Sequence, residues 1–409
     1  MPRRSARLGA CDVPQALGGL GENGSDRVRR GVPERRARAA IAELGAGRNR
    51  SRRGGWRARE DERPCAEERG EEQRDESMSA HDSNASPFRA LGPQADDRAR
   101  GCAMSRVCVF APGVLVTVTI EDHPPGEEVH FHAGGQGAWV ARMAHRLGAR
   151  SVLCTPLGGE AGDVARALLD REGIEVRAVQ QEVDTSAYVH DRRSGERDSL
   201  VEPGAAPLGR HTLDELYSIT LGVAIETGVC VLTGAGAESV LPARTYERLA
   251  HDLRATGSAV IADLHGESAA AALDGGLDLL KISTEELEAD GLVRSLAGEP
   301  ELVEAARTLQ ARGARTVIVS RAEAGTLAVI DDQAYRAVSP QLTAVDTRGA
   351  GDSMTAALAV GLGDSMPIES MLRFASAAGS LNVTRHGLAT GYRPTIDRLS
   401  EKVDVSAVE

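Results

Sequence analysis

The chain of 409 residues lacks several features that would assign it to a class of protein at once. No apolar run reaches the roughly 18 residues that a membrane span needs, and the N-terminus lacks the apolar segment of a signal peptide. Its six cysteines form no CxxC pair and have no histidine partners at ligand spacing, so neither a zinc motif nor a disulfide framework is indicated. We therefore expect a soluble, cytoplasmic protein with reduced thiols. The cysteines are Cys11, Cys65, Cys102, Cys108, Cys154 and Cys230.

Positive charge is unevenly distributed along the chain. Residues 1–103 contain 21 arginines and no lysine against 17 acidic residues, so this segment is about +4 and the rest about −16. An acidic body argues against nucleic acid as a partner, and the acids interleaved in the N-terminal segment weaken its interpretation as a basic arm for nucleic acid or membrane. With few periodic apolar positions, this segment cannot bury enough surface to offset its chain entropy. We predict that residues 1–103 are disordered, or are not translated because the start lies at Met78 or Met104.

From residue 104 onward, short apolar runs alternate with amphipathic runs of helical period. A hairpin predicted over 187–201 would join strands over 114–132 in a small sheet of its own. Elsewhere strands and helices alternate, which implies an α/β fold with a mostly parallel sheet covered by helices on both faces. We place this domain at 104–403 and treat 404–409 as a tail. The other predicted strands are 107–110, 151–154, 176–179, 229–232, 259–262, 277–282, 316–319, 326–330 and 335–338; the predicted helices are 138–147, 161–172, 211–220, 242–255, 301–312, 351–362 and 368–383.

The segment 346–352, with the sequence DTRGAGD, stands between a β-leaning run and an Ala/Leu-rich run of helical character. Gly-Ala-Gly at a helix start leaves backbone N–H groups free, and the helix dipole adds partial positive charge, so the corner is suited to bind an anion. Asp352 stands where a carboxylate can take a proton from a nucleophile beside that anion. Such a corner alone more often reflects tight packing. An anion site next to a base favours phosphoryl transfer.

Two motifs carry a resemblance to a known family. DTRGAGD at 346–352 resembles the DTxGAGD signature of the ribokinase/PfkB carbohydrate kinases, and GGQGAWVARMAHRLGA at 134–149 resembles their GGxGxNxA signature. Both signatures stand in the family's order and in βα context, and the resemblance covers roughly 104–400. The segment Glu202-Pro203-Gly204, together with Lys281, is most similar to the phosphofructokinase and tagatose-6-phosphate kinase branch. Further agreement comes from 232–234, 263–266, 281–287 and Asn382.

This resemblance implies a ribokinase-like three-layer αβα sandwich with a small β-sheet lid, for which 114–132 and 187–201 are the natural strands. In the family the lid often builds a dimer interface, so a homodimer is a further expectation. It also implies ATP-dependent transfer of a phosphoryl group, in which Asp352 deprotonates the acceptor hydroxyl while the amides of Gly349, Ala350 and Gly351 stabilise the moving charge. The residues that the resemblance assigns to the nucleotide are Lys281, Ser283, Ser320, Arg321, Gly325 and Asn382.

By the same resemblance, Glu286 would hold Mg²⁺ directly or through water, although taken alone it is an ordinary exposed helix acid. The acceptor would be a sugar or a sugar phosphate, with fructose 1-phosphate or 6-phosphate expected from the branch. The residues assigned to the acceptor are Gly134, Gly135, Gln136, Leu115 and Trp139.

Several acceptor positions depart from the family pattern. Leu115 stands where the family has Asp, Gln136 where it has Lys, and Trp139 where it has Asn; Ser186 replaces an Arg. On the metal side, Ser283 replaces an Asn. Each change at the acceptor end removes a charge or a polar group, and the sequence leaves open whether Arg192, Arg193 or Arg197 compensates. Two alternatives follow: a nucleoside kinase, since the apolar side chains at 115 and 139 suit a base, or a catalytically weak ligand-binding homologue.

Overall fold

The computed structural model describes residues 104–408 except 125, 196 and 332. These residues belong to one compact unit, Ser83–Glu409. Our predictions for residues 1–103, and the cysteines at 11, 65 and 102, lie outside the described residues. Within them, no helix combines the length and the apolar character that crossing a bilayer requires.

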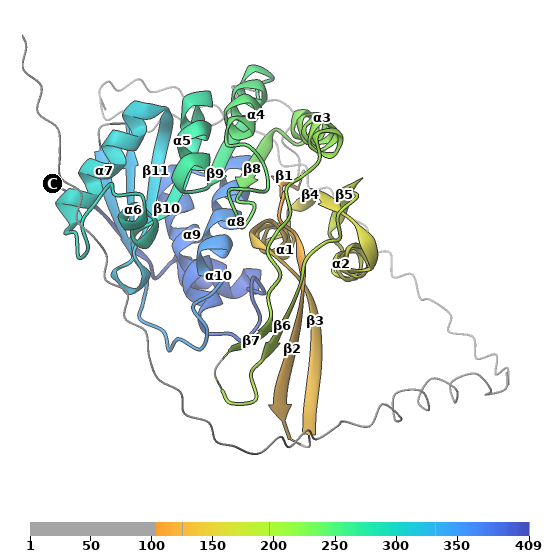
Figure 1. Ribbon diagram of the computed structural model, residues 1–409. Coiled ribbons are helices and arrows are strands. Elements are labelled where there is room, and N and C mark those ends of the chain that lie inside the picture. The colour runs from red at the N-terminus through yellow and green to blue at the C-terminus, as the bar shows by residue number, and fades with distance from the viewer. Residues whose placement is uncertain (1–103, 125, 196, 332, 409) are drawn as a thin grey trace, which may run out of the picture. The chain divides into compact units, whose positions relative to one another are not determined.

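In the described part of the chain, a ten-stranded sheet forms the centre of the unit (Figure 1). Its strand order is β14-β13-β12-β11-β10-β9-β8-β1-β4-β5. The strands from β11 to β5 run parallel, whereas β12, β13 and β14 continue the sheet as antiparallel neighbours. The predicted α/β fold is confirmed. The bounds are β1 Arg106–Phe110, β4 Arg150–Leu157, β5 Glu175–Gln180, β8 Val229–Thr233, β9 Ala259–Asp263, β10 Leu277–Ser283, β11 Ala314–Ser320, β12 Thr326–Ile330, β13 Gln333–Val338 and β14 Asp404–Val408.

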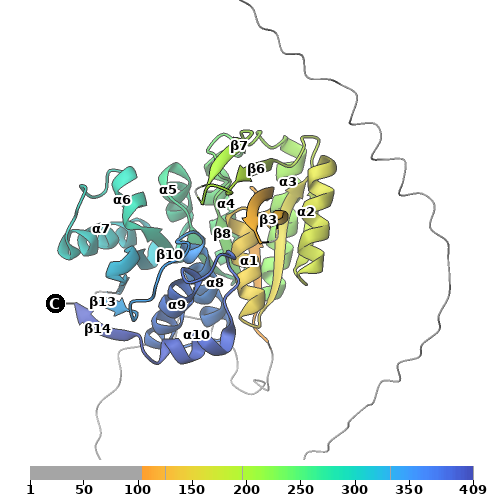
Figure 2. The same ribbon diagram turned by 90° about the horizontal axis from the view of Figure 1, so that it is seen from below.

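Helices cover both faces of this sheet, as the view in Figure 2 shows. The strands are buried on both faces because alternate side chains enter different clusters: Val107 and Val109 of β1 pack on one side, Cys108 and Phe110 on the other. The described cysteines are free, buried thiols. On the Val109 side lie α1 Gln136–Arg146, α2 Gly159–Arg171, α8 Ala350–Gly363, α9 Ile368–Asn382 and α10 Arg393–Ser400; on the Phe110 side lie α3 Arg210–Thr227, α4 Arg244–Ala255, α5 Gly266–Gly275 and α7 Glu299–Arg312.

A separate four-stranded sheet extends from the unit in the order β3-β2-β6-β7 (Figure 1). Its strands are β2 (Leu115–His123), β3 (Gly126–Gly134), β6 (Ala187–Asp191) and β7 (Asp198–Val201). The hairpin predicted over 187–201 is present, and β6 pairs with β2 in parallel. This small sheet is the lid of a ribokinase-like fold, as expected.

Some elements differ from the sequence prediction. The segment treated as a tail, 404–409, contains β14, which pairs with β13 along the sheet edge. Its residues are exposed or half-buried, so no buried apolar run marks them as a strand. Helix α5 has the sequence GESAAAALDG, whose run of alanines gives no amphipathic contrast, and it was not predicted either.

Candidate active site

Two cavities adjoin the start of α8. A small cavity of about 230 Å³ is lined by Ala350 and Gly351, and a large cleft of about 840 Å³ is lined by Asp352, the next residue in the chain. Both lie beyond the carboxyl ends of the parallel strands, where open α/β sheets bind their ligands.

The corner before α8 has the geometry of an anion site. Gly349 is the N-cap residue with a φ of 71°, a left-handed conformation that glycine adopts at little cost. A hydrogen bond of 2.9 Å from the Ser353 amide to the Gly349 carbonyl begins the helical ladder, so the amides of Ala350 and Gly351 precede it. These amides and the helix dipole give the corner partial positive charge.

Asn382 fixes this corner from the end of α9. Its Nδ2 atom donates to the carbonyl of Arg348 (2.7 Å), and its Oδ1 atom accepts from the amide of Ala389 (2.9 Å). The side chain is fully buried and lines neither cavity. Asn382 thus positions the corner, and its contact with the nucleotide stays a prediction.

Asp352 has the properties of a general base. Burial raises the pKa of its carboxyl group to about 7, and the neighbouring Asp263 adds to this effect, whereas Lys281 opposes it. A carboxyl group with a pKa near neutral pH accepts a proton effectively from a hydroxyl held beside it.

A buried ion pair lies next to Asp352. The Lys281 Nζ atom is 3.1 Å from Oδ1 of Asp263, and Thr355 Oγ1 donates to Oδ2 of the same carboxylate at 2.6 Å. Burial lowers the pKa of Lys281, but Asp263, Glu286 and Asp352 together raise it above its ordinary value. Lys281 lies so close to the anion corner that a Cβ atom on Gly351 would be 2.8 Å from Nζ. It lines neither cavity, and its contact with the nucleotide stays a prediction.

The large cleft collects four of the five residues assigned to the acceptor: Gly135, Gln136, Leu115 and Trp139. Gly134 does not line the cleft; it lies at the end of β3, where it pairs with Leu115 of β2. Lid, sheet and helix all contribute to the cleft. Its further lining includes Thr117, Ser186, Tyr188, Arg197, Glu202, Glu238, Tyr246, Asp263, His265 and Glu286.

Gln136 is fixed by the backbone of two neighbouring strand ends. Its Oε1 atom accepts from the amide of Gly234 (2.6 Å), and its Nε2 atom donates to the carbonyl of Asp263 (3.1 Å). The side chain thus ties the start of α1 to the ends of β8 and β9. One lone pair of Oε1 and one N–H group remain for contact with an acceptor molecule.

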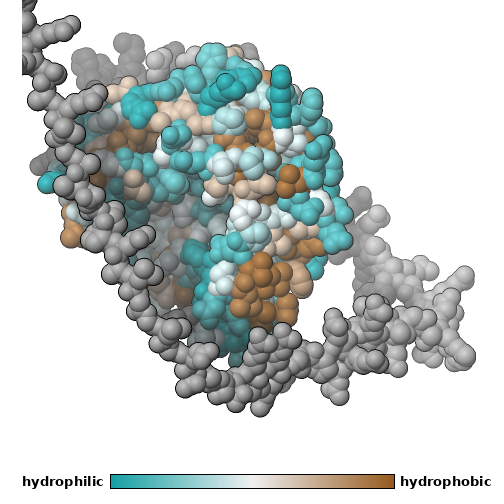
Figure 3. Space-filling model, viewed as in Figure 1, coloured by the Kyte–Doolittle hydropathy of each residue, from teal (hydrophilic) through white to brown (hydrophobic). Residues whose placement is uncertain are grey.

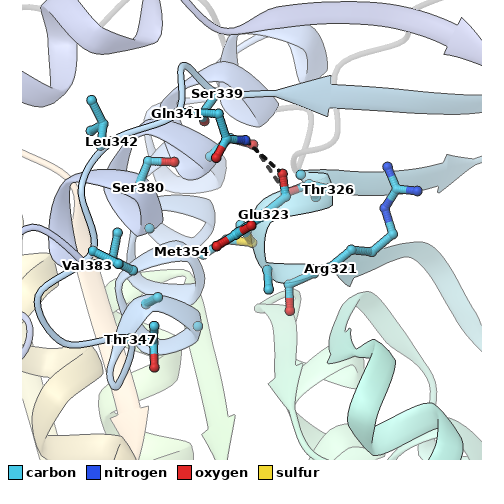
Figure 4. Close-up of a pocket in the computed structure, with 18 of the residues that line it drawn as sticks. Arg321, Glu323, Thr326, Ser339, Gln341, Leu342, Thr347, Met354, Ser380 and Val383 are labelled. Atoms are coloured by element: carbon cyan, nitrogen blue, oxygen red, sulfur yellow. Dashed lines mark hydrogen bonds between the residues drawn. The ribbon is translucent and has the colours of Figure 1, made fainter. Parts of the chain in front are cut away.

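The small cavity contains three of the residues assigned to the nucleotide: Ser320, Arg321 and Gly325. In Figure 4, the guanidinium group of Arg321 points away from Ser380 and Leu342 across the cavity. It is paired with Glu299 (2.9 Å) and donates to the carbonyl of Ala324 (2.8 Å). The wall is completed by Glu323, Thr326, Ser339, Gln341, Leu342, Thr347, Met354, Ser376, Ser380 and Val383.

Ser283 and Glu286 form a capping box at the start of α6 (Thr284–Ala289). The Ser283 amide donates to Glu286 Oε2 (2.7 Å), and the Glu286 amide donates to Ser283 Oγ (3.2 Å). Glu286 also lines the large cleft. The described residues contain no cluster of three His, Cys, Asp or Glu side chains that suits a metal ion. This arrangement fits a Mg²⁺ ion held by one carboxylate, water and nucleotide phosphates, and not a site built from protein ligands alone.

Comparison with known proteins places this geometry in a family. Residues 114–396 match the model of the pfkB family carbohydrate kinases. The chain belongs to the PfkB family. PfkB kinases use ATP and transfer a phosphoryl group to an alcohol group, so the protein is a carbohydrate kinase.

Named relatives agree with the predicted branch. ATP-dependent 6-phosphofructokinase isozyme 2 of Mycobacterium tuberculosis is 31% identical over 301 residues, which cover 71% of this chain and 87% of the relative. 1-Phosphofructokinase of Vibrio cholerae is 28% identical over 280 residues, covering 68% and 87%. Escherichia coli phosphofructokinase-2, solved with fructose-6-phosphate and as a tetrameric inhibited form, matches with TM-scores of 0.63 and 0.65 at 26% and 27% identity; each match covers 73% of this chain and 99% of the other.

The roles of several site residues were not predicted from the sequence. Asp263 was noted only within a matching segment, yet it joins Lys281, Thr355 and Gln136. Its position at the end of a fully buried strand was the available signal, since a carboxylate there needs a partner. The wall of the small cavity formed by 339–344 carries no motif, because that segment is irregular and its side-chain directions are set by tertiary packing.

Proposed function

We propose that the protein transfers the γ-phosphoryl group of ATP to a hydroxyl group of a sugar or sugar phosphate, with Asp352 as the general base. One observation carries this: Gly351 lines the small cavity and Asp352 lines the large cleft. A nucleotide in the first and an acceptor in the second would meet at the start of α8, where amides stabilise charge and a carboxylate accepts a proton.

In the proposed phosphoryl transfer, each residue of the site has a separate role. The acceptor hydroxyl gives its proton to the Asp352 carboxylate as its oxygen bonds to the γ-phosphorus, and the bond from that phosphorus to the β,γ-bridging oxygen breaks, releasing ADP. The amides of Ala350 and Gly351 stabilise charge on the moving group. Burial raises the pKa of Asp352 to about 7, Asp263 adds to this rise, and Lys281 opposes it. When bound, Mg²⁺ would neutralise phosphate charge, with Glu286 as its protein ligand.

Among acceptors, fructose 6-phosphate and fructose 1-phosphate are the first to test, because the relatives described above are phosphofructokinases. A nucleoside is the second candidate, since Trp139 and Tyr188 line the cleft and offer aromatic surface to a base. Release of ADP over a panel of sugars, sugar phosphates and nucleosides distinguishes them, with Asp352→Asn as the blank. Full activity of Asp352→Asn would reject the assignment, and turnover of adenosine but of no sugar would select the nucleoside kinase.

We further propose that the protein forms a homodimer through the outer face of the lid. The strand register places Phe131, Val118, Val189 and Val201 in one row across all four strands. Phe131 and Val201 are 51% and 52% exposed, and Val129 beside them is 54% exposed. Figure 3 shows a hydrophobic patch over the lid. An apolar row across a sheet face with two open edges is suited to pack against a second copy.

A further inference from the structure

The large cleft is short of positive charge for a kinase whose relatives act on phosphorylated sugars. Carboxylates of Glu202, Glu238, Asp263, Glu286 and Asp352 line it, and Arg197 is the only Arg or Lys among its described lining residues. Gln136 carries no charge and is committed to Gly234 and Asp263. Any recognition of a phosphate group in this cleft therefore depends on one guanidinium.

The lid hairpin has three arginines, and the structure shows where each one points. Arg193 is held by Asp191 (2.6 Å) and Glu127 (2.7 Å), at the exposed end of the lid. Arg192 pairs with Glu121 (3.4 Å) and Asp346 (3.9 Å).

Arg197 differs from these two. It lines the cleft, its hydrogen-bond partner is His190, and no acidic side chain of the described residues forms an ion pair with it. Of the three, Arg197 alone has its charge directed into the acceptor space without a paired carboxylate.

The surroundings of Arg197 favour an anion. Burial and then the guanidinium of Arg348 lower the pKa of Arg197, whereas Glu202 and Asp346 raise it; Arg348 itself is paired with Asp346 (2.5 Å). Burial and Arg197 also lower the pKa of His190, whose neutral ring accepts a hydrogen bond from the guanidinium and fixes its direction. A ligand anion in the cleft would form charge-assisted hydrogen bonds with Arg197.

We propose that Arg197 binds the phosphate monoester of a phosphorylated acceptor and so sets the preference of this enzyme for sugar phosphates over neutral sugars. This inference rests on the proposed kinase function. The acceptor would span from Arg197 on the lid to Asp352 at the start of α8.

The test compares Arg197→Gln with Arg193→Gln, which removes an arginine of the same hairpin that pairs outside the cleft. For fructose 6-phosphate and fructose 1-phosphate, kcat/KM of Arg197→Gln should fall about 10- to 100-fold, mainly through KM, as expected for a lost charge-assisted contact. For fructose, kcat/KM should not change. Arg193→Gln should match the wild type on every acceptor, and Arg197→Lys should retain part of the preference because it keeps the charge without the fork geometry.

A second measurement keeps the inference separate from the proposed function. Calorimetric titration of fructose 6-phosphate and fructose 1-phosphate into the wild type and Arg197→Gln, without nucleotide, reports binding alone. If no acceptor releases ADP, the kinase proposal fails, while weaker phosphosugar binding by Arg197→Gln still supports the role of Arg197. Equal losses for fructose and its phosphates, unchanged phosphosugar kinetics and binding in Arg197→Gln, or absence of phosphosugar binding by the wild type would overturn it.

Discussion

The ammonium group of Lys281 lies 3.1 Å from Oδ1 of Asp263, in the buried layer beneath the first turn of α8. Lys281 opposes the rise in the pKa of Asp352, whereas Asp263 promotes it. The two residues that form the ion pair thus act in opposite directions on one carboxyl group. The protonation of the proposed base depends on this buried pair as well as on burial itself.

The pH dependence of turnover follows from the pKa of Asp352, which is about 7. Only the ionised carboxylate accepts a proton, so kcat/KM should fall tenfold per pH unit below about pH 7 and reach a plateau above it. A profile of kcat/KM from pH 5 to 9, at saturating ATP, measures the inflection. An acid limb near pH 4, the range of an unperturbed carboxyl group, would contradict the environment described for Asp352.

The ionisation of Asp352 should lower the free energy of unfolding as pH rises, whereas it raises kcat/KM. Because its folded pKa lies above the ordinary 3.8, the folded state binds more protons between pH 4 and 7, and the free energy of unfolding falls as pH rises through that window. Asn cannot ionise, so Asp352→Asn should be more stable than the wild type at pH 8, and the difference should shrink at pH 5.5. Urea unfolding at both pH values tests this; a variant less stable at pH 8 would refute it.

Replacing Lys281 should affect both activity and folding. In Lys281→Met, Asp263 is left as an unpaired buried charge, which should reduce the free energy of unfolding by about 3–5 kcal/mol. The acid limb of kcat/KM should also move to higher pH, because the cation that lowers the pKa of Asp352 is gone. Lys402 is exposed, and Lys402→Met is the control, expected to match the wild type in both measurements. An unshifted acid limb in folded Lys281→Met would exclude the electrostatic role.

Much of this architecture follows from sequence, because strand and helix periods are local properties. The parallel sheet, the lid strands and the corner at Gly349 were all predicted from patterns within a few residues. The hydrogen bonds of the Gln136 side chain were not predicted, since its two partners, Gly234 and Asp263, lie at the ends of other strands. Likewise, nothing local distinguishes Arg197 from Arg193; only the folded hairpin separates the arginine of the cleft from the one paired with Asp191 and Glu127.

The left-handed conformation of Gly349 provides a test of the anion corner. Any Cβ is strained at a φ of 71°, and Gly349→Ala should lower the free energy of unfolding by about 1–2 kcal/mol and raise KM for ATP by shifting the amides of Ala350 and Gly351. Asn tolerates this conformation better, so Gly349→Asn should lie between the wild type and Gly349→Ala. Urea unfolding and ATP kinetics provide the two readouts. If Gly349→Ala keeps wild-type stability and KM, the corner does not depend on this backbone geometry.

The row across the lid predicts how the proposed dimer can be dissociated. Phe131→Lys places a charge on the apolar face, at the β3 end of the row formed with Val118, Val189 and Val201, where a second copy would desolvate it. Light scattering after size exclusion should give a dimer for the wild type and a monomer for Phe131→Lys. Leu296 is 96% exposed and lies outside the lid, so Leu296→Lys is a matched control that should remain dimeric. A wild type that stays monomeric at micromolar concentration would refute the dimer, and a Phe131→Lys variant that stays dimeric would place the interface elsewhere.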